Sequence, residues 1–296
     1  MRPTFHGSIV ALVTPFRNGN LDEARLRELV EFHVANGTDG IVPCGTTGES
    51  PTLSHDEHKR VVEIVIEAAR GRLPIIAGTG SNSTAEAIDL TGHAKKAGAR
   101  AALVVSPYYN RPTQEGLYRH FRAIAEAVDI PVLVYNIQSR TAVNVETDTL
   151  ARLAKDCSNI VGVKEASGSL DQMTQVILAC GPDFSVLSGD DNLTLPLMAV
   201  GGRGVISVVA NIVPRETADM THAALGGDWK QAREIFHRLF PLCRAMFIET
   251  NPIPVKEAMA MVGLIEPELR LPLCRMSDPN RERLRAILGQ HGLLKR

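Results

Sequence analysis

The chain has 296 residues, of which 44% are apolar and 22% are charged, and its formal net charge at pH 7 is −1. This composition is typical of a soluble globular protein with one large domain, or with one large domain and a small appendage. A nearly neutral chain without a long basic run excludes nucleic acid and anionic membranes as expected partners. No apolar run approaches the roughly 20 residues of a membrane-spanning helix, and the first six residues lack a signal-peptide core. We expect a cytoplasmic protein.

The cysteines and histidines predict neither a disulfide framework nor a metal site. Five cysteines are scattered along the chain without a C-x-x-C pair, so each is expected to be a small buried apolar residue. His55 and His58 lie three residues apart, but no carboxylate completes the spacing of a known metal-binding helix motif. We therefore expect no metal.

Eight short runs rich in apolar and β-branched residues recur along the chain. They cover residues 8–13, 40–44, 73–77, 101–105, 131–135, 160–164, 184–187 and 204–209. Their length and composition predict strands. Near-continuous apolar strands are typical of a parallel sheet that is buried on both faces.

The segments between these runs have helical patterns. Residues 21–36 carry apolar side chains at helical spacing. Ser54-His55-Asp56-Glu57 and Ser83-Thr84-Ala85-Glu86 are each typical of a capping box, and they predict helices that run through Ala69 and stop at Gly98. Eight strands alternating with helices predict an α/β fold of the (β/α)8 TIM-barrel type, with a doubly wound open sheet as the alternative.

The pattern changes after the eighth run. Helical spacing without intervening strands follows over residues 228–249, 254–262 and 278–288. Pro241 is expected to kink or divide the first of these helices. We therefore predict a catalytic barrel over residues 1–226 and a small C-terminal helical domain over residues 227–296.

Lys164 is the most unusual residue at the end of a predicted strand, which is where TIM-barrel active sites lie. It shares a strand face with Gly162, which would leave room for a long side chain in the barrel mouth. A lysine in a partly dry site favours its neutral, nucleophilic form. The strand pattern alone leaves two interpretations open: a Schiff-base nucleophile, or a lysine that reaches solvent or pairs with Glu165.

Other strand ends carry further candidates. Tyr135 could shuttle a proton or cap the core. Thr46 and Thr47 lie in a glycine-flanked loop, where they could relay protons, hold a carboxylate or make turn hydrogen bonds. Arg140 could bind a carboxylate through its two-pronged guanidinium, although an exposed loop arginine is the commoner case.

Eight motifs are spread in order over nearly the whole chain. They are Gly45-Thr46-Thr47-Gly48-Glu49, Pro107-Tyr108-Tyr109-Asn110-Arg111-Pro112, Tyr135-Asn136, Ser139-Arg140-Thr141, Gly162-Val163-Lys164-Glu165-Ala166, Ser188-Gly189-Asp190-Asp191, Gly204-Val205-Ile206-Ser207 and Asn251-Pro252-Ile253-Pro254-Val255-Lys256. Together they resemble the dihydrodipicolinate synthase family of pyruvate-dependent aldolases, whose superfamily also contains N-acetylneuraminate lyase.

The resemblance implies a reaction in which pyruvate forms an imine with Lys164 and no other cofactor takes part. The derived enamine attacks the aldehyde of L-aspartate 4-semialdehyde. Ring closure then releases (4S)-4-hydroxy-2,3,4,5-tetrahydrodipicolinate, the entry point of lysine and diaminopimelate biosynthesis. One alternative is another acceptor aldehyde, as in N-acetylneuraminate lyase or a 2-keto-3-deoxy sugar acid aldolase. A second is a barrel that has lost catalysis and serves as a small-molecule sensor.

The resemblance also implies roles for individual residues. Tyr135 would donate and accept the proton, and Thr46 and Tyr109 would complete its relay. Tyr109 would reach in from a neighbouring subunit of a homotetramer that is a dimer of tight dimers. The substrate-binding positions would be Thr47 for the pyruvate carboxylate, Ile206 through its backbone, Gly189, and Arg140 for the carboxylate of the semialdehyde.

Some members of the family are inhibited by L-lysine in a cleft at the tight dimer interface. The corresponding positions are Ser50, Pro51, His55, His58, Asn82, Glu86 and Tyr108. His58 and Glu86 match the lysine-sensitive pattern, although Glu86 also suits a capping box. Two departures from the family are Gln138, where many members have proline before Arg140, and Pro51, where many have a small residue.

Overall fold

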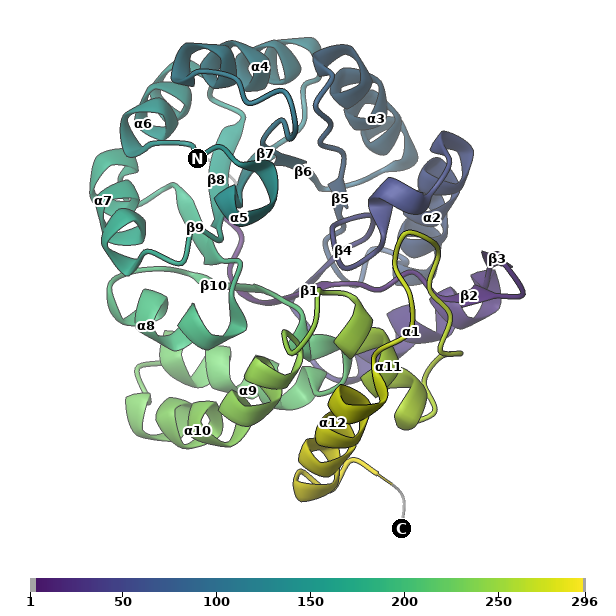
Figure 1. Cartoon of the computed structure of the whole chain (residues 1–296). Coiled ribbons are helices and arrows are strands. Elements are labelled where there is room, and N and C mark those ends of the chain that lie inside the picture. Colours follow the sequence, from purple (N-terminus) through teal and green to yellow (C-terminus); the bar gives the residue numbers. More distant parts are fainter. Residues whose placement is uncertain (1–3, 295–296) are drawn as a thin grey trace.

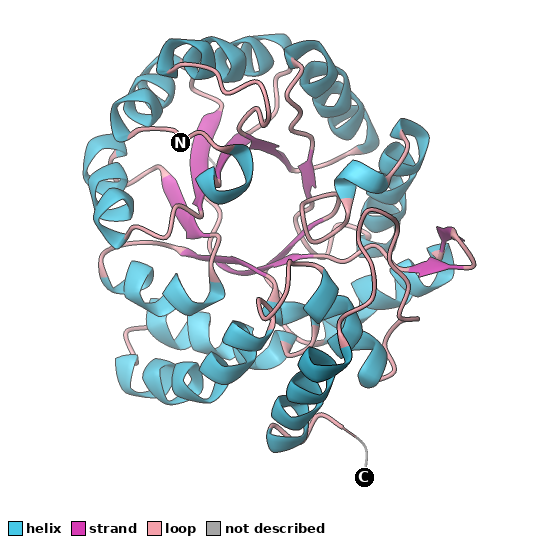
Figure 2. Cartoon of the chain, viewed as in Figure 1, coloured by secondary structure: helices cyan, strands magenta, loops and turns pink. Residues whose placement is uncertain are grey.

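Eight parallel strands form a closed barrel in the computed structural model, which describes residues 4–294 (Figures 1 and 2). The strands are β1 (Gly7–Ala11), β4 (Gly40–Val42), β5 (Ile76–Gly78), β6 (Ala101–Val105), β7 (Val132–Asn136), β8 (Ile160–Glu165), β9 (Ser185–Ser188) and β10 (Gly204–Ser207). They are hydrogen-bonded in the order β4-β1-β10-β9-β8-β7-β6-β5, and a parallel bridge between Ile41 and Ile75 joins the two ends. Each strand overlaps one of the eight apolar runs, so the predicted TIM barrel is confirmed.

Helices surround this ring of strands in Figure 1. They are α1 (Glu23–Ala35), α2 (His55–Ala69), α3 (Thr84–Ala97), α4 (Gln114–Ala127), α6 (Thr147–Asp156), α7 (Leu170–Cys180), α8 (Thr194–Ala199) and α9 (Pro214–Leu225), with a single turn, α5 (Gln138–Thr141), after β7. The capping box of α2 forms as predicted, because Ser54 and Glu57 exchange hydrogen bonds between side chain and backbone in both directions.

The capping box predicted for α3 forms only in part. Ser83 accepts a hydrogen bond from the backbone N–H of Glu86, as an N-cap should. The carboxylate of Glu86 does not return to the helix start, because it is bound by Ser81 and His55 instead. The reciprocal half of the prediction was therefore wrong.

Apolar side chains occupy both faces of the barrel strands, which explains their near-continuous apolar sequence. One cluster faces the barrel axis and includes Ile9, Leu133, Tyr135, Leu187 and Ile206. Other clusters lie between the strands and the helical ring. The polar side chains at the ends of these strands, such as Asn136, Lys164 and Glu165, are buried as well.

The C-terminal segment consists of α10 (Trp229–Ala245), α11 (Ile253–Met261) and α12 (Asp278–Gln290), as the helical spacing predicts. Pro241 lies inside α10 without dividing it, so the predicted division was wrong. A single apolar cluster joins these helices to the barrel through residues such as Leu29, Leu242 and Leu284. The boundary between residues 226 and 227 stays a prediction. Residues 1–3 of the predicted barrel and residues 295–296 of the predicted helical domain lie outside the described part of the chain.

A short hairpin after β1 was missed by the sequence analysis. It pairs β2 (Phe16–Arg17) with β3 (Asn20–Leu21) in antiparallel fashion. Its turn, Asn18-Gly19, has positive φ at both residues, and this dipeptide is the strongest short-range hairpin signal. Among residues 4–294, no helix has both the length and the apolar character that crossing a bilayer requires.

Candidate active site

Lys164 lies near the end of β8 and is almost completely buried, with 5% of its surface exposed. Tyr135 of β7 is its direct neighbour in the sheet register. The Lys164 ammonium nitrogen lies 4.3 Å from the centroid of the Tyr135 ring. The two residues that are predicted to form the imine and to move its protons are therefore in contact at the C-terminal end of the barrel.

Glu165 does not pair with Lys164, because successive side chains on a strand point to opposite faces. Its carboxylate accepts hydrogen bonds from the amides of Asn136 and Gln172 and from the backbone N–H of Ser167. Burial raises the pKa of Glu165, and these hydrogen bonds oppose that shift. The interpretation of Lys164 as the partner of Glu165 is therefore wrong.

The room for the Lys164 side chain comes from a different glycine than expected. A Cβ atom at Gly162 would lie 2.4 Å from the carbonyl oxygen of Ser185, so Gly162 permits the close approach of β9. A Cβ atom at Gly189 would lie 3.2 Å from Cε of Lys164 and 2.5 Å from Cβ of Ala166. Gly189 is therefore the residue whose missing side chain leaves space beside the lysine.

Two carboxyl groups follow Gly189 at the end of β9. Asp191 is buried and accepts hydrogen bonds from the Ser207 hydroxyl at 2.5 Å and from the backbone N–H groups of residues 208–209 at 3.0 Å. Burial raises the pKa of both Asp190 and Asp191, and the nearby charge of Lys164 lowers it. Asp191 thus ties β9 to the end of β10, the strand that carries the fully buried Ile206.

The predicted carboxylate-binding residues meet at a residue to which the sequence analysis assigned no role. Asn251 donates a hydrogen bond from Nδ2 to Oγ1 of Thr47 at 3.1 Å. Its backbone carbonyl accepts a hydrogen bond from Nη2 of Arg140 at 2.9 Å. Gln138, the departure from the usual proline, begins the short helix α5, which carries Arg140. Asn251 therefore connects Thr47 to Arg140 from the C-terminal segment.

A cavity of about 370 Å³ brings together residues predicted for catalysis and for lysine binding. Thr46, Tyr135 and Arg140 line it, as do six of the seven positions of the expected lysine cleft, namely Ser50, Pro51, His55, His58, Glu86 and Tyr108. Asn82, the seventh, accepts a hydrogen bond through its carbonyl from the amide of Asn110. The cavity is not lined by Lys164, Thr47, Gly189 or Ile206. Lys164 nevertheless contacts Tyr135, which lines it.

Glu86 is the carboxylate that lines the part of this cavity formed by the expected lysine cleft. It is bound by Nε2 of His55 at 2.5 Å and by the hydroxyl of Ser81. The hydrogen bond from Ser81, and then that from His55, lower the pKa of Glu86, so it is ionised at neutral pH. Ser81 was missed, because nothing in its local sequence distinguishes it from an ordinary loop serine.

His58 is neutral at physiological pH. Its Nε2 lies 2.9 Å from the carbonyl of Gly78, and its Nδ1 is buried without a partner. Burial lowers the pKa of His58 to about 4. In the described part of the chain, no three histidine, cysteine or acidic side chains gather in a group that could hold a metal ion.

Tyr109 lies outside the cavity of its own chain. It is 92% exposed and has a φ of 71°, a backbone conformation that is uncommon for residues other than glycine. Its neighbour Tyr108 is 39% exposed and lines the cavity. The Tyr109 side chain is thus exposed outside the cavity. The contribution of Tyr109 to another subunit stays a prediction.

Comparisons with known proteins match this arrangement over nearly the full chain. The Dihydrodipicolinate synthetase family matches residues 4–291. A 4-hydroxy-tetrahydrodipicolinate synthase of Syntrophus aciditrophicus is 60% identical over 290 residues, which are 98% of this chain and 99% of the relative.

Solved structures agree with the sequence comparison. The crystal structure of dihydrodipicolinate synthase from Aquifex aeolicus is 54% identical, with a TM-score of 0.97 over 99% of this chain and all of that one. A dihydrodipicolinate synthase structure from Cyanidioschyzon merolae with lysine bound is 42% identical, with a TM-score of 0.94 over 98% of this chain and 99% of that one. The chain therefore belongs to the dihydrodipicolinate synthetase family.

Proposed function

We propose that this chain condenses pyruvate with L-aspartate 4-semialdehyde to form (4S)-4-hydroxy-2,3,4,5-tetrahydrodipicolinate, in lysine and diaminopimelate biosynthesis. The observation that carries the proposal is the buried amine of Lys164 against the ring of Tyr135 at the catalytic end of the barrel. The 60% identity to a relative named for this reaction supports it. The enzyme would be a lyase of the cytoplasm.

The first half of the reaction prepares a carbon nucleophile. The neutral amine of Lys164 attacks C2 of pyruvate, and the carbonyl oxygen leaves as water to give an imine. The protonated imine withdraws electrons from the pyruvate methyl group, which loses a proton to form the enamine. Because the imine itself is the electron sink, the proposal assigns no further cofactor. Thr47 and the backbone of Ile206 would hold pyruvate beside Gly189.

The second half forms the carbon–carbon bond. The enamine carbon attacks the aldehyde carbon of the semialdehyde, and the aldehyde oxygen takes up a proton. The substrate amine then attacks C2, and the Lys164 amine leaves as the ring closes. Tyr135 would transfer these protons, supported by Thr46 and by Tyr109 of a neighbouring subunit. Arg140 would bind the carboxylate of the semialdehyde.

The acceptor aldehyde distinguishes this reaction from those of other pyruvate-dependent aldolases. A 2-keto-3-deoxy sugar acid aldolase or an N-acetylneuraminate lyase would use the same Lys164 and Tyr135. Arg140 lines the same cavity as Tyr135, which favours an acceptor that carries a carboxylate. A side-by-side assay with pyruvate and either aspartate semialdehyde or neutral sugar aldehydes, such as glyceraldehyde and N-acetylmannosamine, tests this choice, and turnover of the sugar aldehydes alone would replace our proposal.

Subunits that carry different defects are expected to restore each other's activity. In a mixed dimer of K164A and Y109F subunits, one site combines an intact Lys164 with the intact Tyr109 of its partner. Random mixing should then restore about a quarter of wild-type activity per subunit, since half of the dimers are mixed and each has one complete site. The measurement is kcat after co-expression. Activity no higher than the mean of the two parent variants would show that Tyr109 does not complete the site of another subunit.

L-lysine is expected to inhibit the enzyme at millimolar concentration. The ionised Glu86 would pair with an ammonium group of the ligand in the cavity. E86Q should raise the lysine concentration for half-maximal inhibition at least about tenfold, because each lost charge-assisted hydrogen bond weakens binding by this order. D89N is a matched control, since Asp89 lies on the same helix and pairs with Lys59 instead. Equal inhibition of E86Q and D89N would exclude this site.

A further inference from the structure

The loop that carries Thr46 and Thr47 has a backbone that its own sequence does not favour. Cys44 and Glu49, at its two ends, have φ values of 55° and 51°, in the left-handed region. Residues other than glycine seldom adopt this conformation, and they keep it only where surrounding structure holds them. Gly48 is packed closely, since a Cβ atom there would lie 3.0 Å from the carbonyl oxygen of Leu12. Tertiary contacts must therefore maintain the loop.

One of these contacts is a buried ion pair between the loop and α11. Nζ of Lys256 lies 2.5 Å from Oε1 of Glu49 and 2.9 Å from the carbonyl oxygen of Thr14. The exposed fractions of the Lys256 and Glu49 side chains are 1% and 0%. The ring of Phe16 lies 4.3 Å from the ammonium nitrogen. Burial lowers the pKa of Lys256, and Glu49 opposes this shift.

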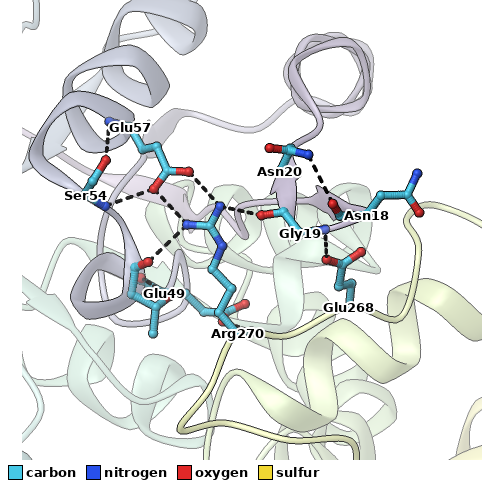
Figure 3. Close-up of polar contacts among 9 residues, drawn as sticks. Asn18, Gly19, Asn20, Glu49, Ser54, Glu57, Glu268 and Arg270 are labelled. Atoms are coloured by element: carbon cyan, nitrogen blue, oxygen red, sulfur yellow. Dashed lines mark hydrogen bonds and ion pairs between the residues drawn. The ribbon is translucent and has the colours of Figure 1, made fainter.

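The segment after α11 completes the coordination of Glu49. The backbone N–H of Arg270 donates to Oε2 of Glu49 at 3.2 Å. The Arg270 guanidinium binds the carboxylate of Glu57 and the carbonyl of Gly19 (Figure 3). It also donates to the carbonyl of Thr52. Both carboxylate oxygens of Glu49 are thus bound by the C-terminal segment.

We propose that Lys256 is a positioning residue, which holds the hydroxyls of Thr46 and Thr47 in place through its ion pair with Glu49. This inference rests on the proposed function, in which these threonines serve the proton relay and the pyruvate carboxylate. Lys256 follows Asn251 by five residues, and Asn251 binds Thr47 directly. Residues 251–256 of the C-terminal segment therefore bind the loop at two points, Thr47 in its middle and Glu49 at its end.

The choice of an ion pair is itself informative. Desolvation offsets most of the attraction within a buried ion pair, so neutral side chains of similar volume often preserve stability. Neutral side chains do not require their polar ends to meet, whereas two buried charges do, and this requirement fixes the distance between the loop and α11. Loss of the pair should therefore affect the position of the loop more than the stability of the fold.

The test compares E49Q/K256M with a control that removes a neighbouring ion pair, E257Q/R281M. Glu257 lies beside Lys256 on α11 and is also buried, but it pairs with Arg281 of α12, at 2.6 Å, and not with the loop. Glutamine at position 49 keeps the acceptor for the Arg270 N–H. Each protein is examined by thermal unfolding, by steady-state kinetics, and by the pyruvate concentration that gives half-maximal borohydride trapping.

We expect E49Q/K256M to unfold within a few degrees of the wild type while its half-maximal trapping concentration and its pyruvate KM rise roughly tenfold or more, since small displacements of positioning groups have effects of this size. The KM for aspartate semialdehyde should change less than the KM for pyruvate. The control should keep wild-type values for both substrates.

Three results would overturn the inference. They are an unchanged pyruvate KM in folded E49Q/K256M, an equal rise in the control, and failure of both E49Q/K256M and a second neutral pair, E49Q/K256Q, to fold while the control folds. In the last case the pair is a requirement of folding and not of positioning. Absence of pyruvate trapping in the wild type would instead contradict the proposed function, so the two failures are distinguishable.

Discussion

K164A is expected to lower kcat on the order of 10⁴-fold or more, because removal of a covalent nucleophile eliminates the whole reaction path. Borohydride with pyruvate should add a reduced pyruvyl group to the wild type and none to this variant. Peptide mass spectrometry locates the adduct. The fold should survive, since Lys164 forms no ion pair within 4 Å among the described residues and its ammonium is buried against Tyr135.

A second buried lysine makes this experiment specific. Lys256 is even less exposed than Lys164, but its ammonium is occupied by Glu49 and the Thr14 carbonyl. An amine whose hydrogens are held by a carboxylate and a carbonyl in this way is not free to attack a substrate carbonyl. An adduct on Lys256, or one that persists in K164A, would show that the nucleophile lies elsewhere.

Y135F is expected to lower kcat roughly 10²- to 10³-fold, which is the usual size of a lost general acid–base group. Phenylalanine keeps the ring that contacts Lys164 and removes only the hydroxyl. The adduct should therefore still form, but more slowly, so the time course of borohydride trapping should lengthen while its final extent stays the same. Steady-state kcat and trapping kinetics together separate proton transfer from binding.

Tyr118 provides a matched control for Y135F. It is also a buried tyrosine, but it lies on α4 and donates its hydroxyl to Asp156 at 2.8 Å, outside the cavity. Y118F should cost about 1 kcal/mol of stability through the lost hydrogen bond and leave kcat unchanged. A similar fall in kcat for both variants would mean that Tyr135 acts only through packing.

Local sequence patterns predicted the elements of the barrel because each pattern reports on one element. The apolar runs predicted all eight strands, since a strand buried on both faces must be apolar along its length. Ser54 and Glu57 predicted the start of α2, because a capping box is closed by residues three positions apart. The motif around Lys164 singled out a lysine whose burial and contact with Tyr135 are now explicit.

The partners of individual side chains were decided by the tertiary structure alone. Gly162 lies within β8 and Gly189 follows β9, and only the packing of β9 and Ala166 distinguishes which of these glycines leaves room for Lys164. Glu86 had the spacing of a capping residue, and the approach of His55 from α2 directed it into the cavity instead.

The sequence by itself determined the barrel, the family and the strand ends at which the candidate site residues lie. The tertiary structure decided how the loop with Thr46 and Thr47 is held. The contacts that hold it join Thr47 to Asn251 and Glu49 to Lys256, more than 200 positions apart in the chain. Such pairs leave no local pattern, because they form only when the C-terminal segment packs against the loop that follows β4.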